Sequence, residues 1–183
     1  SRHLLSLQTT SVMKDSDGQP TSRTETTYDE TAYSPQFAVG NPTTLRLWNN
    51  VKGSPEDPNA YISTHARFDT FGNTIETIDP RGNSTRTEFD AANHAFPVKT
   101  TTSVPDPSNT YGSATAFVST ATYDPATGLQ LSDTDPNGLE TRMEYDPATL
   151  RPVSTKMFFA GAPIGGVSEM IYGDVAGNMT IKS

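Results

Sequence analysis

The sequence contains no cysteine, so disulfide bonds and thiolate metal sites are excluded. Hydrophobic residues are also scarce, at 33% of the chain, which is low for a closed globular domain. No window shows apolar residues at the 3.6-residue period of an amphipathic helix. Together these absences argue against a disulfide-bonded scaffold, a large closed core and a helical fold.

Positive charge is in the minority: 13 Lys and Arg stand against 21 Asp and Glu, for a net charge of -8. Nucleic acid and anionic membrane surfaces both attract a basic face, so we expect neither as a partner. The most apolar run, residues 157–167, is too short and too rich in Gly and Pro to insert into a membrane.

The two ends of the chain also lack expected features. Residues 1–7 have too short an apolar run for a signal peptide, and the last residues break off inside an expected strand. We therefore expect the chain to be a segment of a longer protein.

Thr, Pro and Gly are abundant, with 14 Pro and 13 Gly in 183 residues. This mixture favours extended strands joined by many turns. The length suits one domain or a few stacked repeats. We predict an all-β fold of tandem antiparallel β-hairpins in a curved, open spiral sheet.

Residues 68–90 organise this prediction, because they contain two Asp-x-x-Gly tetrads between two aromatic-Asp pairs. Asp at the first position, Gly at the fourth, and Pro80 at the second are typical of a type I turn followed by a left-handed residue. The stretch therefore predicts turn, strand, turn, strand, and then a new unit.

A second copy of this pattern lies at residues 123–146. The string Thr-Arg-x-Glu-aromatic-Asp recurs in both copies, and ten residues separate Asp79 from Phe89 and Asp135 from Tyr145. The whole chain, residues 1–183, is therefore interpreted as one repeat segment with units near 6–60, 61–115 and 116–165 and a partial unit at 166–183.

The repeated residues have a structural explanation. Each aromatic ring can cover a turn and stack on its neighbour, each Asp can accept turn amides, and each Gly can adopt a positive φ. Asn93 is expected to take a left-handed conformation in the turn after residue 90, and residues 160–166 are expected to form a Gly-Pro loop. The predicted turn and stacking residues are Tyr28, Asp29, Phe68, Asp69, Gly72, Asp79, Gly82, Phe89, Asp90, Tyr123, Asp124, Gly128, Asp135, Gly138, Tyr145, Asp146, Tyr172 and Gly177.

These motifs resemble the tyrosine-aspartate (YD) repeats of Rhs proteins, in the order aromatic-Asp, Gly, Asp, Gly, aromatic-Asp. The resemblance covers most of the chain and departs at Gly173, which follows Tyr172 where Asp is expected. In bacterial Rhs proteins, insecticidal toxin complexes and teneurins, such repeats form a β-strand shell. The resemblance implies a structural segment of a secreted or cell-surface bacterial protein, with flanking repeats and an encapsulated C-terminal toxin as partners.

Other functions are weighed against this structural one. Asp15-Ser16-Asp17-Gly18 starts like a calcium loop but lacks the later ligands, so a turn is expected there. The three histidines are far apart and no nucleophile elbow is present, so we expect no enzyme, no metal site and no cofactor. The alternative is a carbohydrate-binding or adhesion module that contacts a cell-surface glycan through loop aromatics, namely Trp48, Tyr61 and Tyr111.

Two further expectations concern surfaces. Arg86 with Glu88, and Arg142 with Glu144, should form a ladder of charges between strands. The irregular loops at residues 30–41, 49–59 and 105–112 are the preferred places for specific binding.

Overall fold

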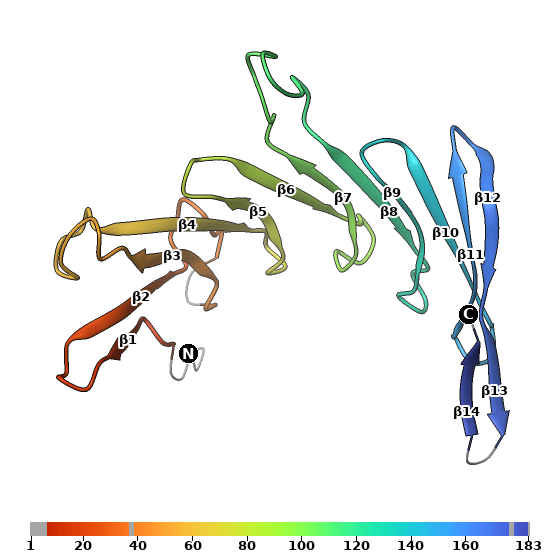
Figure 1. Cartoon of the computed structure of the whole chain (residues 1–183), viewed down its shortest axis with the longest axis horizontal. Coiled ribbons are helices and arrows are strands. Elements are labelled where there is room, and N and C mark those ends of the chain that lie inside the picture. The colour runs from red at the N-terminus through yellow and green to blue at the C-terminus, as the bar shows by residue number, and fades with distance from the viewer. Residues whose placement is uncertain (1–6, 37–38, 176–177, 183) are drawn as a thin grey trace. The chain divides into compact units, whose positions relative to one another are not determined.

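A computed structural model describes residues 7–36, 39–175 and 178–182, and their regular elements are all β-strands (Figure 1). The Thr- and Val-rich segments form the strands, and the Asp-, Pro- and Gly-rich segments form the turns, as their local preferences predict. The strands are β1 (Thr10–Lys14), β2 (Pro20–Tyr28), β3 (Pro42–Trp48), β4 (Tyr61–Phe68), β5 (Thr74–Ile78), β6 (Ser84–Phe89), β7 (Pro97–Thr102), β8 (Val118–Tyr123), β9 (Gln130–Thr134), β10 (Leu139–Tyr145), β11 (Pro152–Phe159), β12 (Ala162–Glu169), β13 (Ile171–Val175) and β14 (Asn178–Lys182).

Strands β1 to β12 follow one another in chain order in an open sheet, and β13 and β14 form a separate pair. Neighbouring strands run antiparallel, as in β4 with β5 and β9 with β10. Several pairings shift register at the strand end that adjoins a turn, for example between Arg67 and Phe68. The predicted all-β architecture of antiparallel hairpins is confirmed.

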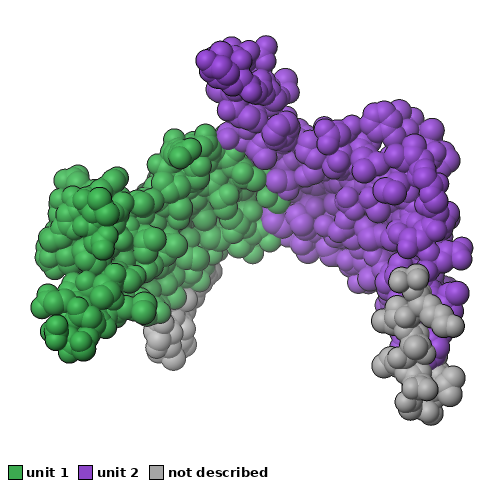
Figure 2. Space-filling model, viewed as in Figure 1, with its two compact units in different colours: residues 1–87 green, residues 88–183 purple. Residues whose placement is uncertain are grey.

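The chain divides into two compact units, residues 1–87 and residues 88–183 (Figure 2). The division falls inside the predicted repeat unit at 61–115, so a compact unit is not the same thing as one repeat. The repeat boundaries near residues 60, 115 and 165 stay a prediction.

Among the described residues, the buried hydrophobic side chains are Ala60, Tyr61 and Phe68, all in the first unit. Such a small core cannot carry the fold by apolar burial alone. Backbone ladders and contacts between neighbouring hairpins therefore provide most of the cohesion, as in other repeat architectures.

The two faces of the sheet differ sharply in the first unit. Register pairs Glu25 with Arg46, and Glu76 with both Arg67 and Arg86, so these side chains share one face. The opposite face carries uncharged residues in β2 to β6. We call these the charged and the uncharged face of the first unit; the latter includes Thr24, Thr26, Leu45, Leu47, Ile62, Thr64, Ala66, Thr77 and Thr85.

The second unit shows the same division. Its charged face carries Lys99, Glu140, Arg142, Glu144 and Lys156, which the register places on one side of β7 to β11. Its uncharged face carries Leu131, Leu139, Thr141, Met143, Met157 and Phe159 and one acid, Asp133.

The expected Gly-Pro loop at residues 160–166 is wrong. Only Ala160 and Gly161 turn the chain, with φ of 48° and 79°, and β12 begins at Ala162. Two consecutive residues with positive φ make a tight turn whose twist matches a hairpin. The ladder with β11 therefore extends through Pro163 and Ile164 despite the loop-like composition.

Candidate functional site

Asp79 closes the turn between β5 and β6. The Gly82 amide donates to the Asp79 carbonyl at 3.0 Å, and the Asp79 amide donates to the Asn83 carbonyl at 2.9 Å. The Asp79 carboxylate accepts the amides of Arg81 and Asn83, both at 2.8 Å. Gly82 has φ of 87°, where any Cβ would be strained. This is a type I turn with a left-handed fourth residue, as the tetrad predicts.

The same atoms recur in three other turns. Each carboxylate accepts the amides two and four residues ahead: Asp15 from Asp17 and Gln19, Asp69 from Phe71 and Asn73, and Asp135 from Asn137 and Leu139. The fourth residues, Gly18, Gly72 and Gly138, have φ between 78° and 90°. In particular, residues 15–18 form a turn.

Longer turns also place an Asp at the first position. Asp124 accepts the Ala126 amide at 2.7 Å, and Asp146 accepts the Thr149 amide at 2.7 Å. Asp29, itself at φ of 55°, accepts the amides of Val39, Gly40 and Asn41. Thus the turn acids bind backbone donors, and this arrangement holds the loops together.

The turn after Asp90 differs from expectation in one detail. The left-handed residue is His94, with φ of 53°, and not Asn93. The Asn93 amide instead donates to the Asp90 carboxylate at 2.6 Å. The side chain of Asp90 also accepts the amides of Ala95 and Phe96, each at 2.9 Å.

These hydrogen bonds stabilise the ionised carboxylates. The amides of Phe96 and its neighbours lower the pKa of Asp90 to about 2. The Asn83 side chain and then the Asn83 amide lower the pKa of Asp79. The Leu139 amide lowers the pKa of Asp135, and the Thr149 amide lowers that of Asp146. Carboxylates of this kind are kept ionised and are poorly suited to serve as general acids.

Three of the marked aromatic residues bind neighbouring backbone, and the others are buried, half-buried or stacked. The hydroxyl groups of Tyr28, Tyr145 and Tyr172 donate to the carbonyls of Gln8, Gln130 and Pro152 at 2.8 to 2.9 Å. Phe68 is buried, and Phe89 is half-buried. The Tyr123 ring stacks on Phe96 with 5.2 Å between centroids. Gly177, the last of the predicted turn residues, lies outside the described residues.

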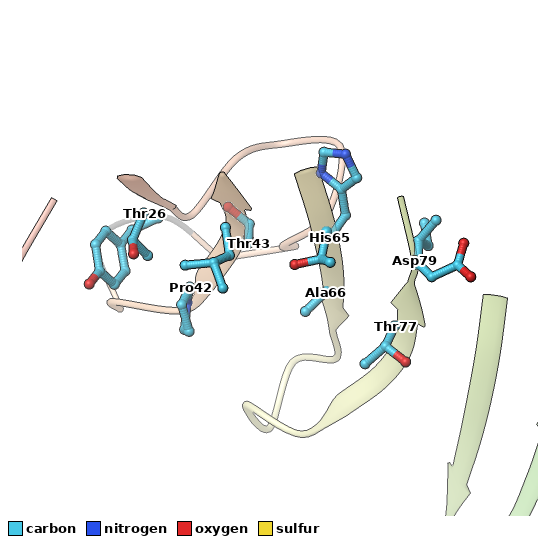
Figure 3. A pocket seen from close by; sticks show the side chains of 11 residues that line it. Thr26, Pro42, Thr43, His65, Ala66, Thr77 and Asp79 are labelled. Carbon is cyan, nitrogen blue, oxygen red and sulfur yellow. The ribbon is translucent and has the colours of Figure 1, made fainter. Parts of the chain in front are cut away.

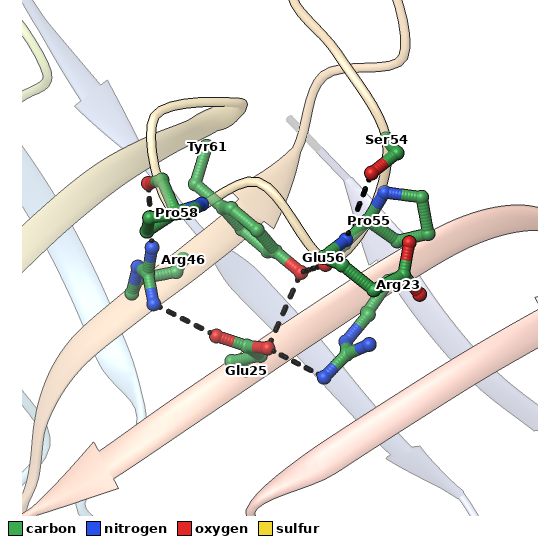
Figure 4. Close-up of polar contacts among 8 residues, drawn as sticks. All are labelled: Arg23, Glu25, Arg46, Ser54, Pro55, Glu56, Pro58 and Tyr61. Atoms are coloured by element: carbon green, nitrogen blue, oxygen red, sulfur yellow. Dashed lines mark hydrogen bonds and ion pairs between the residues drawn. The ribbon is translucent and has the colours of Figure 1, made fainter.

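Two of the three predicted glycan-binding aromatics contact the loop at residues 49–59. Trp48 donates from Nε1 to the Gly53 carbonyl at 2.9 Å. Tyr61 is buried under the Arg46 guanidinium, and its hydroxyl group lies 2.8 Å from the Pro55 carbonyl (Figure 4). Burial, and then Glu25, raise the pKa of Tyr61. Their glycan-binding role stays a prediction.

The loop at residues 29–41 packs on the next hairpin through residues that the sequence did not single out. Tyr33 stacks on His65 with centroids 4.7 Å apart, and the Phe68 amide donates to the Tyr33 carbonyl at 2.8 Å. His65 Nδ1 lies 2.9 Å from Thr44 Oγ1, and Thr44 also bonds to Glu30. No spacing signal links Tyr33 to His65, because the contact depends on the strand register.

The loop at residues 103–117 holds Tyr111, the third predicted aromatic. Its side chain is 98% exposed. The backbone around it is bound to Asp106, whose Oδ2 accepts the amides of Thr110, Tyr111 and Gly112. This loop and its aromatic residue therefore differ from the other two, which pack on their own sheet.

An open groove of about 610 Å³ lies in the first unit along β2 to β5 (Figure 3). Its lining is mostly hydroxyl and methyl groups, and Asp79 is its one acid. Among the described residues, no group of three or more His, Asp or Glu lies close enough to hold a metal ion. No helix in the described part is long and apolar enough to span a membrane.

The expected ladder of charges is present on the charged faces. Glu76 lies between Arg67 at 2.8 Å and Arg86 at 2.9 Å, and its hydrogen bond from Arg86 lowers its pKa. Glu88 pairs with Lys99, and Glu144 pairs with Lys156. Arg142 instead binds Glu140 of its own strand and lies over the Phe158 ring.

No family model matches the sequence, and no curated protein matches it. Solved structures do match. They include TcdB2-TccC3-Cdc42 (17% identity, TM-score 0.57) and TcdB2-TccC3 (18% identity, TM-score 0.57), each covering 93% of this chain and 9% of the other. The Photorhabdus luminescens Tc holotoxin pore matches at 16% identity and a TM-score of 0.51, covering 93% of this chain and 11% of the other.

This likeness shows the fold. It is the fold that the YD-repeat resemblance predicted, and it is shared with toxin-complex proteins. The chain spans only about a tenth of the length of the solved chains that it matches, 9% to 11%. At these identities, the comparison supplies a fold and leaves activity and partners to be proposed.

Proposed function

We propose that this chain is a structural wall segment of a secreted or cell-surface bacterial protein of the Rhs type. It contributes repeats to a shell that encapsulates or presents a toxin or another C-terminal cargo. Its partners are the flanking repeats of the parent protein and that cargo. We assign no catalytic role and no cofactor to it.

The separation of charge between the two faces of each unit carries this proposal. A sheet that met water on both faces would gain nothing by confining nearly all of its strand charges to one face. Leu45 and Leu47 in the first unit, and Met157 and Phe159 in the second, are exposed on the uncharged faces. Contiguous exposed apolar groups mark a contact surface. A shell wall whose charged face meets solvent and whose uncharged face meets enclosed polypeptide accounts for this separation of charge.

Cysteine labelling tests this proposal, because the segment has no cysteine of its own. Leu47→Cys places a thiol on the uncharged face, where the native side chain is 47% exposed. Arg86→Cys is the matched control on the charged face, where the side chain is 70% exposed. Maleimide should label both variants in the isolated segment.

In the full parent protein, labelling at position 47 should fall at least tenfold while labelling at position 86 persists. Deletion of the C-terminal cargo should restore labelling at position 47. Equal labelling at both positions in the parent protein would refute the enclosed face.

The alternative, carbohydrate binding or adhesion through loop aromatics, is favoured by the exposure of Tyr111. Titration with neutral oligosaccharides while following Trp48 fluorescence tests it. A saturable change that Tyr111→Ala weakens would support this function. A flat titration would exclude the use of Trp48.

A further inference from the structure

The loop between β7 and β8, residues 103–117, protrudes from the second unit (Figures 1 and 2). We call it the Tyr111 loop. Asp106 organises it from one end: its Oδ2 accepts the Gly112 amide at 3.0 Å and the Thr110 amide at 2.6 Å, and its Oδ1 accepts the Ser108 amide at 3.0 Å. The Asp106 amide in turn donates to the Ser113 carbonyl at 3.0 Å.

These bonds fix the loop internally. The Ser108 hydroxyl, and then the amides of Tyr111 and its neighbours, lower the pKa of Asp106. Asn109 completes the turn with φ of 53°, a conformation that Asn tolerates better than most residues. The hydrogen bonds inside the loop therefore converge on one ionised carboxylate.

The other two insertion loops bind the sheet beneath them, through Tyr33 on His65 and through Gly53 and Pro55 on Trp48 and Tyr61. By contrast, the hydrogen bonds of the Tyr111 loop, within the described chain, all stay between residues 102 and 117. Ordering a loop costs conformational entropy. Residues 105–112 are exposed apart from Asp106, so ordering them buries little apolar surface of the fold, and we infer that their order serves a contact outside it.

The ordered loop presents Tyr111, which is 98% exposed and whose backbone amide is bound to Asp106. Rigid, exposed Tyr side chains surrounded by Ser, Asn and Gly are typical of binding loops, because Tyr supplies a large contact area at low entropic cost. Asp106 is the sole charged residue of residues 103–117, and the loop's own amides occupy its carboxylate. The presented surface is thus neutral and convex.

Convexity and hydrogen bonding favour a protein partner over a glycan. A sugar needs several polar side chains directed to the space beside the ring. The Ser108 hydroxyl is bonded within the loop to Asp106 and Thr110, and the Ser113 hydroxyl is bonded to the Thr115 carbonyl. A protruding loop with one aromatic anchor instead suits insertion into a concave protein surface.

We propose that the Tyr111 loop is a recognition loop that inserts Tyr111 into an uncharged concave site on a protein partner. This role goes beyond that of a wall segment and does not depend on it. The interface places Tyr111 at its centre and leaves the sheet faces free.

Photo-crosslinking tests the proposal in the native host, with the full natural chain carrying p-benzoylphenylalanine at position 111. The matched control carries the same probe at position 51, in another insertion loop, where Val51 is 90% exposed. We expect one protein to crosslink from position 111 and not from position 51. Excess wild-type segment should reduce that product at least tenfold, whereas segment with Tyr111→Ala should not.

Equal products from both positions, no product, or equal competition by the two segments would overturn the proposal. Tyr111-dependent binding of the wild-type segment to neutral oligosaccharides would also overturn it, in favour of a glycan partner.

Asp106→Asn separates positioning from contact. Because the hydrogen bonds of the Asp106 carboxylate stay within the loop, the melting temperature should change little. Competition by the Asp106→Asn segment for the crosslink should weaken several-fold, as Tyr111 loses its fixed backbone. Competition equal to that of wild type would contradict the positioning role of Asp106. Labelling at position 47 is independent of these results, so failure of this proposal and failure of the wall role are distinguishable.

Discussion

Gly128 and Leu150 occupy the same left-handed position in two equivalent turns, with φ of 75° and 58°. Both turns begin Asp-Pro-Ala-Thr, and in each the fifth residue donates its amide to the carbonyl of the Asp at 2.8 Å. Gly128 adopts this left-handed conformation without strain, whereas Leu150 is strained by it.

This pair gives the first prediction. Leu150→Gly should raise the free energy of unfolding by about 0.5 kcal/mol, because relief of a left-handed Leu outweighs the added chain entropy. Gly128→Ala should lower it by about 1–2 kcal/mol, since its Cβ would also lie 3.3 Å from Phe96 Cε1. Urea midpoints measure both. A destabilised Leu150→Gly variant would contradict the strain.

A second prediction isolates backbone strain from crowding at Gly82. A Cβ there would meet no atom within 4 Å, yet φ is 87°. Gly82→Val should therefore lower the free energy of unfolding by about 1–3 kcal/mol through strain alone. Gly166→Ala is the control, because it too meets no atom within 4 Å and has no left-handed φ. Similar urea midpoints for both variants would refute this explanation.

A third prediction concerns the turn carboxylates. Asp79→Ala and Asp135→Ala each remove two side-chain bonds to backbone amides. By analogy with lost helix caps, each should lower the melting temperature by about 2–4 °C. Asp17→Ala, in the middle of the first turn, is the control and should change it less. Unchanged melting in both turn variants would show that the carboxylates do not hold these turns.

A fourth prediction is acid sensitivity. The pKa of Asp90 is lowered from 3.8 to about 2. Between these two pH values the folded chain therefore binds fewer protons than the unfolded chain. Stability from Asp90 is therefore fully present well above pH 3.8 and is lost as the pH falls through about 2. Asp79, Asp135 and Asp146 shift in the same direction.

Urea midpoints between pH 6 and pH 2 measure this effect, and Asp90→Asn should flatten the slope at the acid end. A wild-type midpoint that rises as the pH falls would have the wrong sign for these shifts.

A fifth prediction follows from the edges. Strand β1 is at one end of the described strand order, and its five residues are all exposed. Strand β12 is at the other end, where Gly165 and Gly166 interrupt its register with β11. A flat edge pairs more readily than an interrupted one.

The isolated segment should therefore associate through β1, and light scattering at rising concentration measures this association. Val12→Lys should reduce it more than Val167→Lys, which changes an exposed residue of β12. A monomer at all concentrations would exclude edge pairing.

The turns could be predicted from sequence because their chemistry is local. Asp79, Pro80 and Gly82 each prefer the conformation that the structure gives them. Leu150 was not predictable, because a Leu side chain does not favour a positive φ. The positive φ of His94 was missed because the neighbouring Asn93 offered the stronger signal.

Contacts between distant segments were also beyond sequence reasoning. The stack of Tyr33 on His65 depends on how β3 and β4 pair. Residues 162–166, the first part of β12, were predicted as a loop, because pairing with β11 overrides their Gly and Pro content. For the candidate sites, the sequence identified Tyr111 but not the carboxylate that positions it.

The chain-order pairing of β1 to β12 has a consequence for how such proteins are made and how they change. A strand that pairs only with its predecessor and successor closes short loops, so folding avoids the slow search for distant partners that delays most β-proteins. The sheet can grow hairpin by hairpin as the chain leaves the ribosome. For the same reason, a gene could gain or lose a whole hairpin, and the remaining strands would keep their neighbours.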